Sequence, residues 1–287
     1  MKARGRTKVA GVVGWPVAHS LSPLIHNAWI EALQLDAVYR AYPVEPEADA
    51  FEQLVWRLMR AGCAGLNVTA PFKERALTVS QDYEGNLLPL GNANLLKLER
   101  FDDFDLLMAY NTDPVGLLYA LAREQADRGL ADRRVIVLGA GAAARTAAVT
   151  LTQASAEVTI VNRTFERACT LADKVGAFAA PWSELGELIP RAEILINATS
   201  AVHGGQALEI DLSDADIDLT VVEMSYRPLR TPLLRQAEAL GLRTVDGLAM
   251  LIGQARPSFE IFFGVTPPPA TVVDARALCV QALEAAA

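Results

Sequence analysis

The segment from Gly65 to Glu74 places three polar side chains of different chemistry close together in the chain. Asn67 and Thr69 end an apolar stretch, and Lys73 follows after a proline turn. In a β-strand, residues two apart lie on the same face, so Asn67 and Thr69 would point the same way. Small polar groups beside one ammonium group would suit a hydroxylated, anionic small molecule. The competing interpretation is a strand end followed by a solvated lysine.

A glycine-rich turn follows the apolar segment 134–138, with Gly139, Gly141 and Ala144 in a G-x-G-x-x-A pattern. Gly139 permits a tight turn, Gly141 lets the backbone approach a pyrophosphate, and Ala144 allows a helix to pack closely on the strand. The helix N-terminus supplies amide donors and a partial positive charge. The pattern alone is weak, but its place between a strand and a helix indicates a dinucleotide site rather than a plain turn.

The end of the next apolar strand indicates which dinucleotide is bound. NAD sites usually carry an acidic residue there for the ribose 2′-hydroxyl. Here the strand ends in Asn162 and Arg163, and Arg167 follows one helical turn later. Two guanidinium groups could hold a 2′-phosphate, which favours NADP over NAD. The alternative is that both arginines only decorate the start of a helix.

The amino-acid composition is typical of a globular protein and argues against a nucleic-acid partner. The 287 residues are 52% hydrophobic and 21% charged, with mean hydropathy +0.21, and the length predicts about two domains. The formal charge is −8 with no basic cluster, which argues against nucleic acid. An anionic substrate would therefore depend on a few local donors.

Cysteine and histidine usage favours a reducing cytoplasm and no metal. Cys63, Cys169 and Cys279 are far apart, and the three histidines have no metal-ligand spacing. The apolar run after the basic start is short and is broken by Gly14 and Pro16, so we expect a first β-strand rather than a signal peptide. No run reaches transmembrane length.

The pattern along the chain predicts an α/β protein of two domains. In the first third we expect strands at 9–14, 37–44, 63–69, 94–99 and 106–110, with helices at 22–35, capped by Ser22, and 48–61. The strands 94–99 and 106–110 are expected to pair. Beyond them we expect strands at 134–138, 158–161, 194–197, 220–224 and 243–245, and helices at 113–128, 142–154, 165–175 and 229–240.

This second run is typical of a Rossmann-type, doubly wound parallel sheet. The last helices, 248–263 and 270–285, add no strand and are expected to pack back on the first domain. We therefore predict an N-terminal mixed α/β substrate domain, residues 1–112 completed by 248–287, and an NADP-binding domain at 113–247.

The order of short motifs resembles the shikimate dehydrogenase family over nearly the whole chain. The matching segments are 14–23, 67–74, 92–94, 111–113, 139–144, 162–164, 197–199, 226–228 and 246–255. Many separate motifs in the right order are more specific than any one of them. The resemblance implies an NADP-dependent enzyme that interconverts 3-dehydroshikimate and shikimate in aromatic amino-acid biosynthesis. It also implies an active site in a cleft between the domains, with hinges near 112–114 and 246–248.

The resemblance assigns roles residue by residue. It implies Lys73 and Asp113 as the catalytic pair, with proton shuttling and charged hydrogen bonding both open for Lys73. It places the substrate carboxylate at Ser20 and Ser22, and the rest of the substrate at Asn67, Thr69, Asn94, Tyr226 and Gln254. For the cofactor it implies Gly139, Ala140, Gly141, Ala142, Ala143, Asn162, Arg163, Thr164, Arg167, Thr199 and Gly247.

Each of these roles has a simpler alternative. Ser20, Ser22 and Asp113 could be helix caps only. Gln254 could be an exposed helix position, and Tyr226 could lie at the edge of a core. The departures from the family pattern are Leu95, Pro114, Val202, His203, Glu223 and Arg256.

Two other functions stay open at this point. One is a paralogue that acts on quinate or aminoshikimate, and the other is a non-catalytic protein that senses a dinucleotide. The sequence predicts a small-molecule substrate and no membrane partner, and it leaves monomer or homodimer open.

Overall fold

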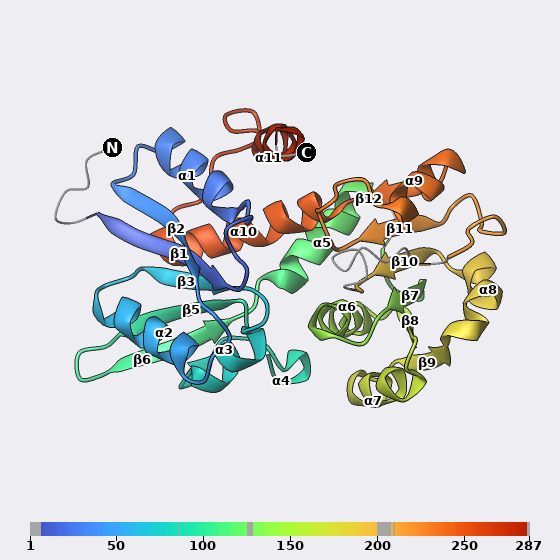
Figure 1. Cartoon of the computed structure of the whole chain (residues 1–287), viewed down its shortest axis with the longest axis horizontal. Helices are drawn as coiled ribbons and strands as arrows, with labels where there is room; N and C mark the ends of the chain where they lie inside the picture. The colour runs from blue at the N-terminus through green and yellow to red at the C-terminus, as the bar shows by residue number, and fades with distance from the viewer. Residues whose placement is uncertain (1–6, 86, 125–128, 200–207, 209, 286–287) are drawn as a thin grey trace. The chain divides into compact units, whose positions relative to one another are not determined.

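The computed structural model describes residues 7–85, 87–124, 129–199, 208 and 210–285. The chain divides into two compact units (Figure 1). Unit 1 comprises residues 1–113 and 251–287, and unit 2 comprises residues 114–250. Unit 1 is therefore discontinuous in sequence, whereas unit 2 is a single stretch.

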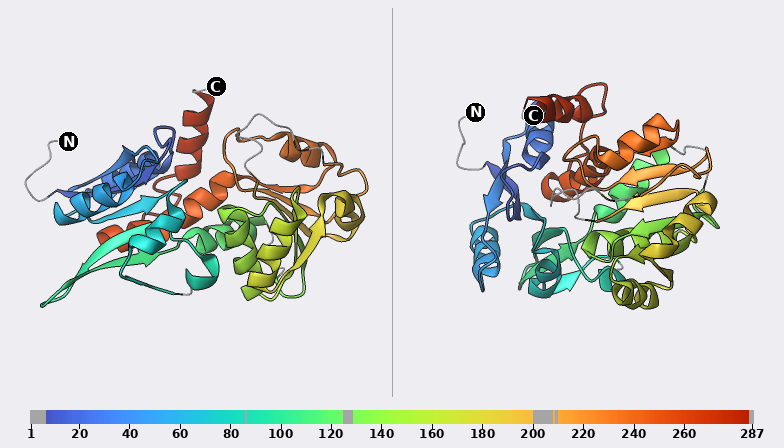
Figure 2. Two further views of the ribbon diagram at one scale, coloured as in Figure 1. Left: turned by 60° about the horizontal axis from the view of Figure 1, so that its bottom comes forward. Right: turned by 45° about the vertical axis from the view of Figure 1, so that its right-hand side comes forward.

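A six-stranded mixed sheet forms the centre of unit 1. Its strands are β1 (Lys8–Gly14), β2 (Ala37–Pro43), β3 (Gly65–Val68), β4 (Asp82–Tyr83), β5 (Leu95–Arg100) and β6 (Asp105–Tyr110), in the order β2-β1-β3-β5-β6-β4. The strands β1, β2 and β3 are parallel, whereas β5 pairs antiparallel with β3 and β6. The predictions of a first strand and of the β5–β6 pairing are confirmed. Figure 2 shows these two strands projecting as a hairpin arm.

The helices of unit 1 bury one face each. These are α1 (Ser22–Ala32), α2 (Ala50–Arg60), α3 (Lys73–Val79), α4 (Leu87–Leu90) and α11 (Ala275–Glu284), with the later part of α10 (Gly247–Phe263). In α2 the buried residues are Phe51, Val55 and Met59, one every four positions, as an amphipathic helix requires. The N-cap of α1 is Leu21, without a side-chain cap, so the prediction of Ser22 as the cap is wrong by one residue.

The C-terminal segment packs on the N-terminal part of unit 1. Phe259 of α10 meets Trp29 edge-on at 5.5 Å between ring centroids, and Phe262 lies 6.2 Å from Tyr39. His26 stacks on Tyr39 at 4.1 Å. All five rings are buried. The prediction that the last helices pack back on the first domain is confirmed.

Unit 2 is built on a six-stranded, entirely parallel sheet. Its strands are β7 (Arg134–Leu138), β8 (Glu157–Asn162), β9 (Phe178–Pro181), β10 (Ile194–Asn197), β11 (Thr220–Glu223) and β12 (Arg243–Val245), in the order β12-β11-β10-β7-β8-β9. The reversal of strand order at β7 is the doubly wound arrangement that the sequence predicts.

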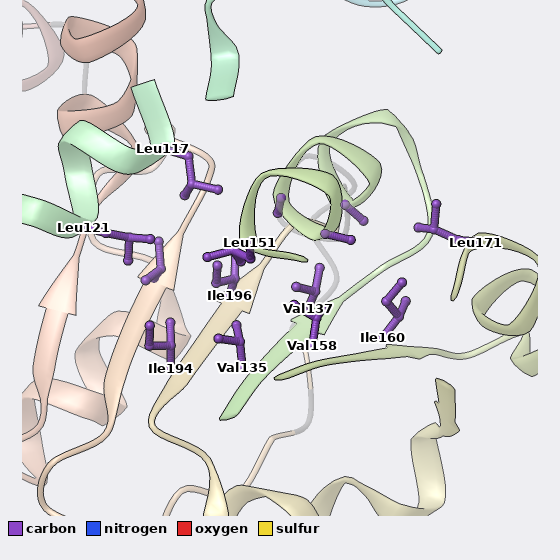
Figure 3. Packing of buried hydrophobic residues seen from close by; sticks show 14 of the residues in the cluster. Leu117, Leu121, Val135, Val137, Leu151, Val158, Ile160, Leu171, Ile194 and Ile196 are labelled. Atoms are coloured by element: carbon purple, nitrogen blue, oxygen red, sulfur yellow. The ribbon is translucent and has the colours of Figure 1, made fainter. Parts of the chain in front are cut away.

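Helices cover both faces of this sheet. Successive residues of β7 belong to different cores, Val135 and Val137 to one and Ile136 and Leu138 to the other, because strand side chains alternate. The first core joins α5 (Asp113–Glu124), α6 (Ala142–Gln153) and α7 (Phe165–Val175) to the sheet (Figure 3). The second core includes α8 (Leu185–Leu188) and α9 (Pro232–Ala239).

The sequence pattern does not predict several short elements. They are α3, α4, β4, β9, α8 and two single turns of 3₁₀-helix, Trp182–Glu184 and Ile189–Arg191. None exceeds seven residues, so none shows a clear hydrophobic period. Among the described residues, no helix has the length and apolar character needed to cross a membrane.

Candidate active site

Lys73 and Asp113 form an ion pair in unit 1. The Lys73 Nζ lies 2.5 Å from Asp113 Oδ2, and the two side chains are 26% and 9% exposed. Lys73 is the first residue of α3, and its backbone carbonyl accepts a hydrogen bond from Ala93 N at 2.9 Å. The lysine of the proline turn is therefore not a freely solvated surface residue.

The helix that carries Lys73 is anchored to α2 by two side chains. Phe72 stacks on Phe51 with 4.8 Å between ring centroids. Arg75 forms an ion pair with Glu52 and lies over both rings. These contacts fix the short α3, which has no side-chain cap of its own.

Asp113 is oriented by two asparagines. Asn94 Nδ2 donates to Asp113 Oδ1 at 2.8 Å, and Asn111 Oδ1 accepts from Asp113 N at 3.0 Å. Asn111 is itself held by Asn92 Oδ1, which accepts from Asn111 Nδ2 at 2.8 Å. Asp113 begins α5, but both of its carboxylate oxygens accept from Lys73 and Asn94. Its side chain thus does more than cap a helix.

Asn67 links three other residues of the site by hydrogen bonds. Its Nδ2 donates to Asn94 O at 3.2 Å and to Ser258 Oγ at 3.0 Å, while its Oδ1 accepts from the Tyr39 hydroxyl at 2.7 Å. Both N–H groups are engaged and the residue is buried. The amide can therefore offer a ligand little more than one oxygen lone pair. Tyr39 and Ser258 were missed because neither lies in a polar cluster of the sequence.

Asn94 occupies the centre of the same network. Its Oδ1 accepts from Thr112 N at 2.8 Å, and its Nδ2 lies 2.9 Å from Thr112 Oγ1. The Thr112 hydroxyl is 3.1 Å from Ser258 Oγ and 3.2 Å from Gln254 Oε1. Gln254 is half-buried in α10, so the alternative of an exposed helix position is wrong. Hydrogen bonds thus connect Tyr39 to Lys73. The intermediate residues are Asn67, Asn94 and Asp113.

Ser20 lies in the loop between β1 and α1, Ser22 is the first residue of α1, and Thr69 directly follows β3. Ser22 N donates to Ser20 Oγ at 3.3 Å, which is the local contact expected of a helix start. Thr69 follows the end of β3, and Thr69 N donates to Val13 O at 2.9 Å. Glycine at position 14 leaves room for the Thr69 side chain, because a Cβ there would come within 2.3 Å of the Thr69 methyl group.

Unit 2 contains a pocket of about 320 Å³ around the glycine turn. Its lining residues are Gly139, Ala140, Gly141, Ala142, Ala143, Asn162, Arg163, Arg167, Trp182, Ala198, Thr199 and Leu208. Trp182 and Leu208 carry no motif and were missed. Of the predicted cofactor residues, Thr164 and Gly247 are not part of this lining.

The shape and charge of this pocket fit a dinucleotide with a 2′-phosphate. Gly139 has φ +110°, and a Cβ there would lie 3.2 Å from Ala198 O. A Cβ on Gly141 would meet no atom of the described residues within 4 Å, which leaves space above this backbone for a phosphate group. Arg163 and Arg167 are exposed at the same pocket. Their guanidinium groups match the bidentate chemistry of phosphate.

The other predicted residues of unit 2 are not among the residues that line this pocket. A Cβ on Gly247 would lie 2.5 Å from the Ser225 carbonyl carbon, so glycine is needed for this approach. Thr164 O accepts from Asn162 Nδ2 at 2.9 Å in the turn that starts α7. Tyr226 is half-buried in the loop after β11.

The departures from the family pattern fall in different environments. Leu95 is fully buried in β5, where it fills the core of unit 1. Arg256 is half-buried in α10, and nothing in the structure explains its choice. Val202 and His203 lie outside the described residues.

Three protein-family models match successive parts of the chain. They are the shikimate dehydrogenase substrate binding domain at residues 12–96, shikimate / quinate 5-dehydrogenase at 120–204 and the shikimate 5′-dehydrogenase C-terminal domain at 247–275. The shikimate dehydrogenase (NADP(+)) of Caulobacter vibrioides strain NA1000 / CB15N is 44% identical over 283 residues, which are 97% of each chain. The chain belongs to the shikimate dehydrogenase family. The resemblance inferred from the motifs is confirmed.

Two solved structures share the fold over nearly the whole chain. Shikimate 5-dehydrogenase from Thermus thermophilus, in complex with NADP(H) and shikimate, has a TM-score of 0.81 and 33% identity. The match covers 94% of this chain and 99% of that one. The 5-ketofructose reductase of Gluconobacter sp. strain CHM43 has a TM-score of 0.84 and 30% identity, covering 97% and 100%. The predicted fold class is confirmed, and the second neighbour shows that its fold also occurs in an enzyme with a different name.

Proposed function

We propose that this protein is an NADP-dependent oxidoreductase that interconverts 3-dehydroshikimate and shikimate. The observation that carries the proposal is the Lys73–Asp113 pair, with Nζ 2.5 Å from Oδ2 inside a buried network of amides and hydroxyls. The curated relatives named shikimate dehydrogenase (NADP(+)) support it, with 39–44% identity over more than nine-tenths of this chain. A dinucleotide sensor would have no need for this ion pair.

NADP, when bound, supplies or accepts the hydride at the carbinol carbon of the substrate. We infer that Gly139, Gly141 and the start of α6 hold its pyrophosphate, and that Arg163 and Arg167 hold its 2′-phosphate. Unit 2 offers the pocket for these groups, with backbone amides at a helix N-terminus and two arginines.

The protein must also move a proton, because the oxygen on the reacting carbon gains one on reduction and loses one on oxidation. We assign Lys73 Nζ as the donor to that oxygen, and its ion pair with Asp113 supports this assignment. Asn94 holds the carboxylate and Asn111 holds the backbone amide of Asp113, so few orientations are open to the pair. A group that is already oriented needs no rearrangement at the moment of reaction.

The substrate itself would be held by neutral donors rather than by an arginine. We assign to the substrate the hydroxyl and amide groups of four residues in unit 1. They are Ser20, Thr69 and Gln254, which are partly exposed, and Ser22, whose backbone N–H donates to Ser20 Oγ. Asn67 and Asn94 act mainly through these neighbours, because their own N–H groups are engaged. The three free cysteines are consistent with a reducing cytoplasm, which we propose as the compartment.

A steady-state assay tests this function directly. The purified chain is given shikimate or quinate, each with NADP or NAD, and formation of reduced cofactor is followed by its absorbance. We expect the highest kcat/KM for shikimate with NADP. Faster turnover of quinate would move the assignment to a quinate-type paralogue. An absence of turnover with every pair, by protein that binds NADP, would favour the sensor.

A further inference from the structure

A carboxyl group is buried at the end of β11, away from Lys73 and Asp113. Glu223 is 1% exposed. Asn197 Nδ2 donates to its Oε2 at 2.8 Å, Ser225 N donates to its Oε1 at 3.3 Å, and the Thr231 hydroxyl also hydrogen-bonds to it. Burial raises the pKa of Glu223, and these hydrogen bonds oppose that shift. These partners, with the backbone amide of Met224, can all donate, which suits a carboxylate as the acceptor.

Asn197 ends the neighbouring strand β10, opposite Glu223 in the register of the sheet. Both ends of its amide are engaged, because Nδ2 donates to Glu223 while Oδ1 accepts from Thr199 N at 3.1 Å and from Thr199 Oγ1 at 2.8 Å. Glu223 accepts only from the nitrogen end of this amide. It therefore determines that the oxygen end faces Thr199.

Thr199 connects this buried chain to the cofactor pocket. Thr199 and Ala198 line the pocket together with the glycine turn. They also pack on Gly139, where a Cβ would lie 3.2 Å from Ala198 O and 3.4 Å from the Thr199 methyl group. A change in the orientation of Asn197 would release Thr199 and alter this wall.

We propose that Glu223 is a positioning residue for the NADP site, and that it acts through Asn197 to hold Thr199 against the glycine turn. The inference rests on the proposed NADP binding. Glu223 itself does not line the pocket. Its contribution is to give the Asn197 amide a single orientation.

Single substitutions that keep the shape should weaken NADP binding. Glu223→Gln puts a second amide opposite Asn197. Every orientation of the two amides then leaves one pair of donors facing each other, at Ser225 N, at Thr199 N or between the amides themselves. Asn197→Asp puts two carboxylates side by side. We expect the Kd for NADP, measured by isothermal titration calorimetry, to rise about tenfold in each case, as for an unpaired buried polar group.

The double variant Glu223→Gln with Asn197→Asp reverses the polarity of the pair and restores every hydrogen bond. The new amide at 223 donates to the new carboxylate at 197, which still accepts twice from Thr199. We expect its Kd to return to within about threefold of the unchanged protein. A role of Glu223 that does not pass through Asn197 predicts no such rescue, because the double variant still lacks a carboxylate at position 223. The double variant also tests the proposal if Glu223→Gln does not fold, since only the restored pair should then fold and bind.

Thr220→Val is the matched control. Thr220 is fully buried at the opposite end of the same strand, where it accepts from Arg243 Nε at 3.4 Å. This change should lower the Tm and leave the Kd for NADP unchanged. Unchanged binding by Glu223→Gln, or a double variant no better than the singles, would overturn the proposal. If the unchanged protein binds no NADP, the proposed function fails as well, so the two failures are distinguishable.

Discussion

Lys73 and Lys97 offer a direct comparison at the scale of single residues. Both are ion-paired in unit 1 and similarly exposed, at 26% and 28%, but Lys97 pairs with Glu99 on the surface of β5. We expect Lys73→Ala to lower kcat by about 10²- to 10⁴-fold, the usual contribution of a proton-transfer group, with KM changed only slightly. Steady-state kinetics with shikimate and NADP measure both constants.

Lys97→Ala should leave kcat within about twofold, because exposed ion pairs contribute little. If Lys73→Ala raised KM and spared kcat, Lys73 would bind the substrate rather than take part in the chemical step.

The side chain of Arg163 can be tested by a second single substitution. Replacing it with leucine removes a guanidinium from the pocket at the start of α7. We expect KM for NADP to rise about tenfold or more while KM for NAD stays nearly constant, because only NADP carries the 2′-phosphate. Lys174→Ala, an exposed charge at the other end of α7, controls for the loss of one positive charge. Equal losses for both cofactors would refute the assignment.

At the scale of elements, the turn between β7 and α6 separates packing from binding. Gly141 has φ −92°, which alanine tolerates, and a Cβ there would meet no atom in the part of the chain that the structure describes. Gly141→Ala should therefore leave the Tm unchanged but weaken NADP binding about tenfold, since the methyl group occupies the space for the phosphate. Calorimetric Kd and thermal melts test the two halves. Gly139→Ala, at φ +110°, should lower the Tm as well.

The hydrogen bond between β2 and β3 can be tested by its own matched pair. The Tyr39 hydroxyl donates to Asn67 Oδ1 at 2.7 Å. Tyr39→Phe leaves that buried oxygen without its donor, which should cost about 1–3 kcal/mol of unfolding free energy in urea. Tyr42 lies on the same strand, and among the described residues its hydroxyl has no hydrogen bond. Tyr42→Phe should change stability by less than about 0.5 kcal/mol, and an equal loss would show that Asn67 does not depend on Tyr39.

Sequence patterns were sufficient for the elements that repeat a clear period. The strand at 134–138 and the helix at 165–175 have the predicted bounds, because each is uniformly apolar or amphipathic between turn residues. The helix α3 was missed because seven residues give too little periodicity. Its stability comes from Phe72 and Arg75 packing against α2, and those contacts are not local in sequence.

The site was predictable where chemistry-bearing residues sit in motifs. Lys73 and Asp113 are 40 residues apart, and only their motifs linked them before the structure placed their atoms 2.5 Å apart. Tyr39 and Ser258 could not be inferred, since each becomes relevant only when β2 and α10 meet Asn67. The catalytic and binding roles themselves stay predictions.

For the molecule as a whole, a buried histidine sets part of the response to acid. Burial lowers the pKa of His26 from 6.5 to about 3, and both ring nitrogens lack a hydrogen-bond partner among the described residues. Between these two values the unfolded chain binds a proton that the folded chain does not. Stability is therefore lost as pH falls below about 6.5, by up to about 1.4 kcal/mol per pH unit, until pH approaches 3.

His26→Phe should remove this part of the acid sensitivity, because it keeps a ring stacked on Tyr39 without a titrating group. The measurement is the unfolding free energy in urea between about pH 4 and about pH 7. A slope unaltered by His26→Phe would mean that carboxylates alone account for it.

The discontinuity of unit 1 has a consequence for the order in which a nascent chain can fold. Residues 114–250 are contiguous, so unit 2 has its whole sequence as soon as that stretch leaves the ribosome. Unit 1 begins earlier but needs Ser258, Phe259 and Phe262 to close its polar network and its aromatic core. The part of unit 1 that precedes unit 2 therefore cannot complete its packing until residues 251–287 follow. We expect unit 2 to fold before the lysine–aspartate site has all of its supporting contacts.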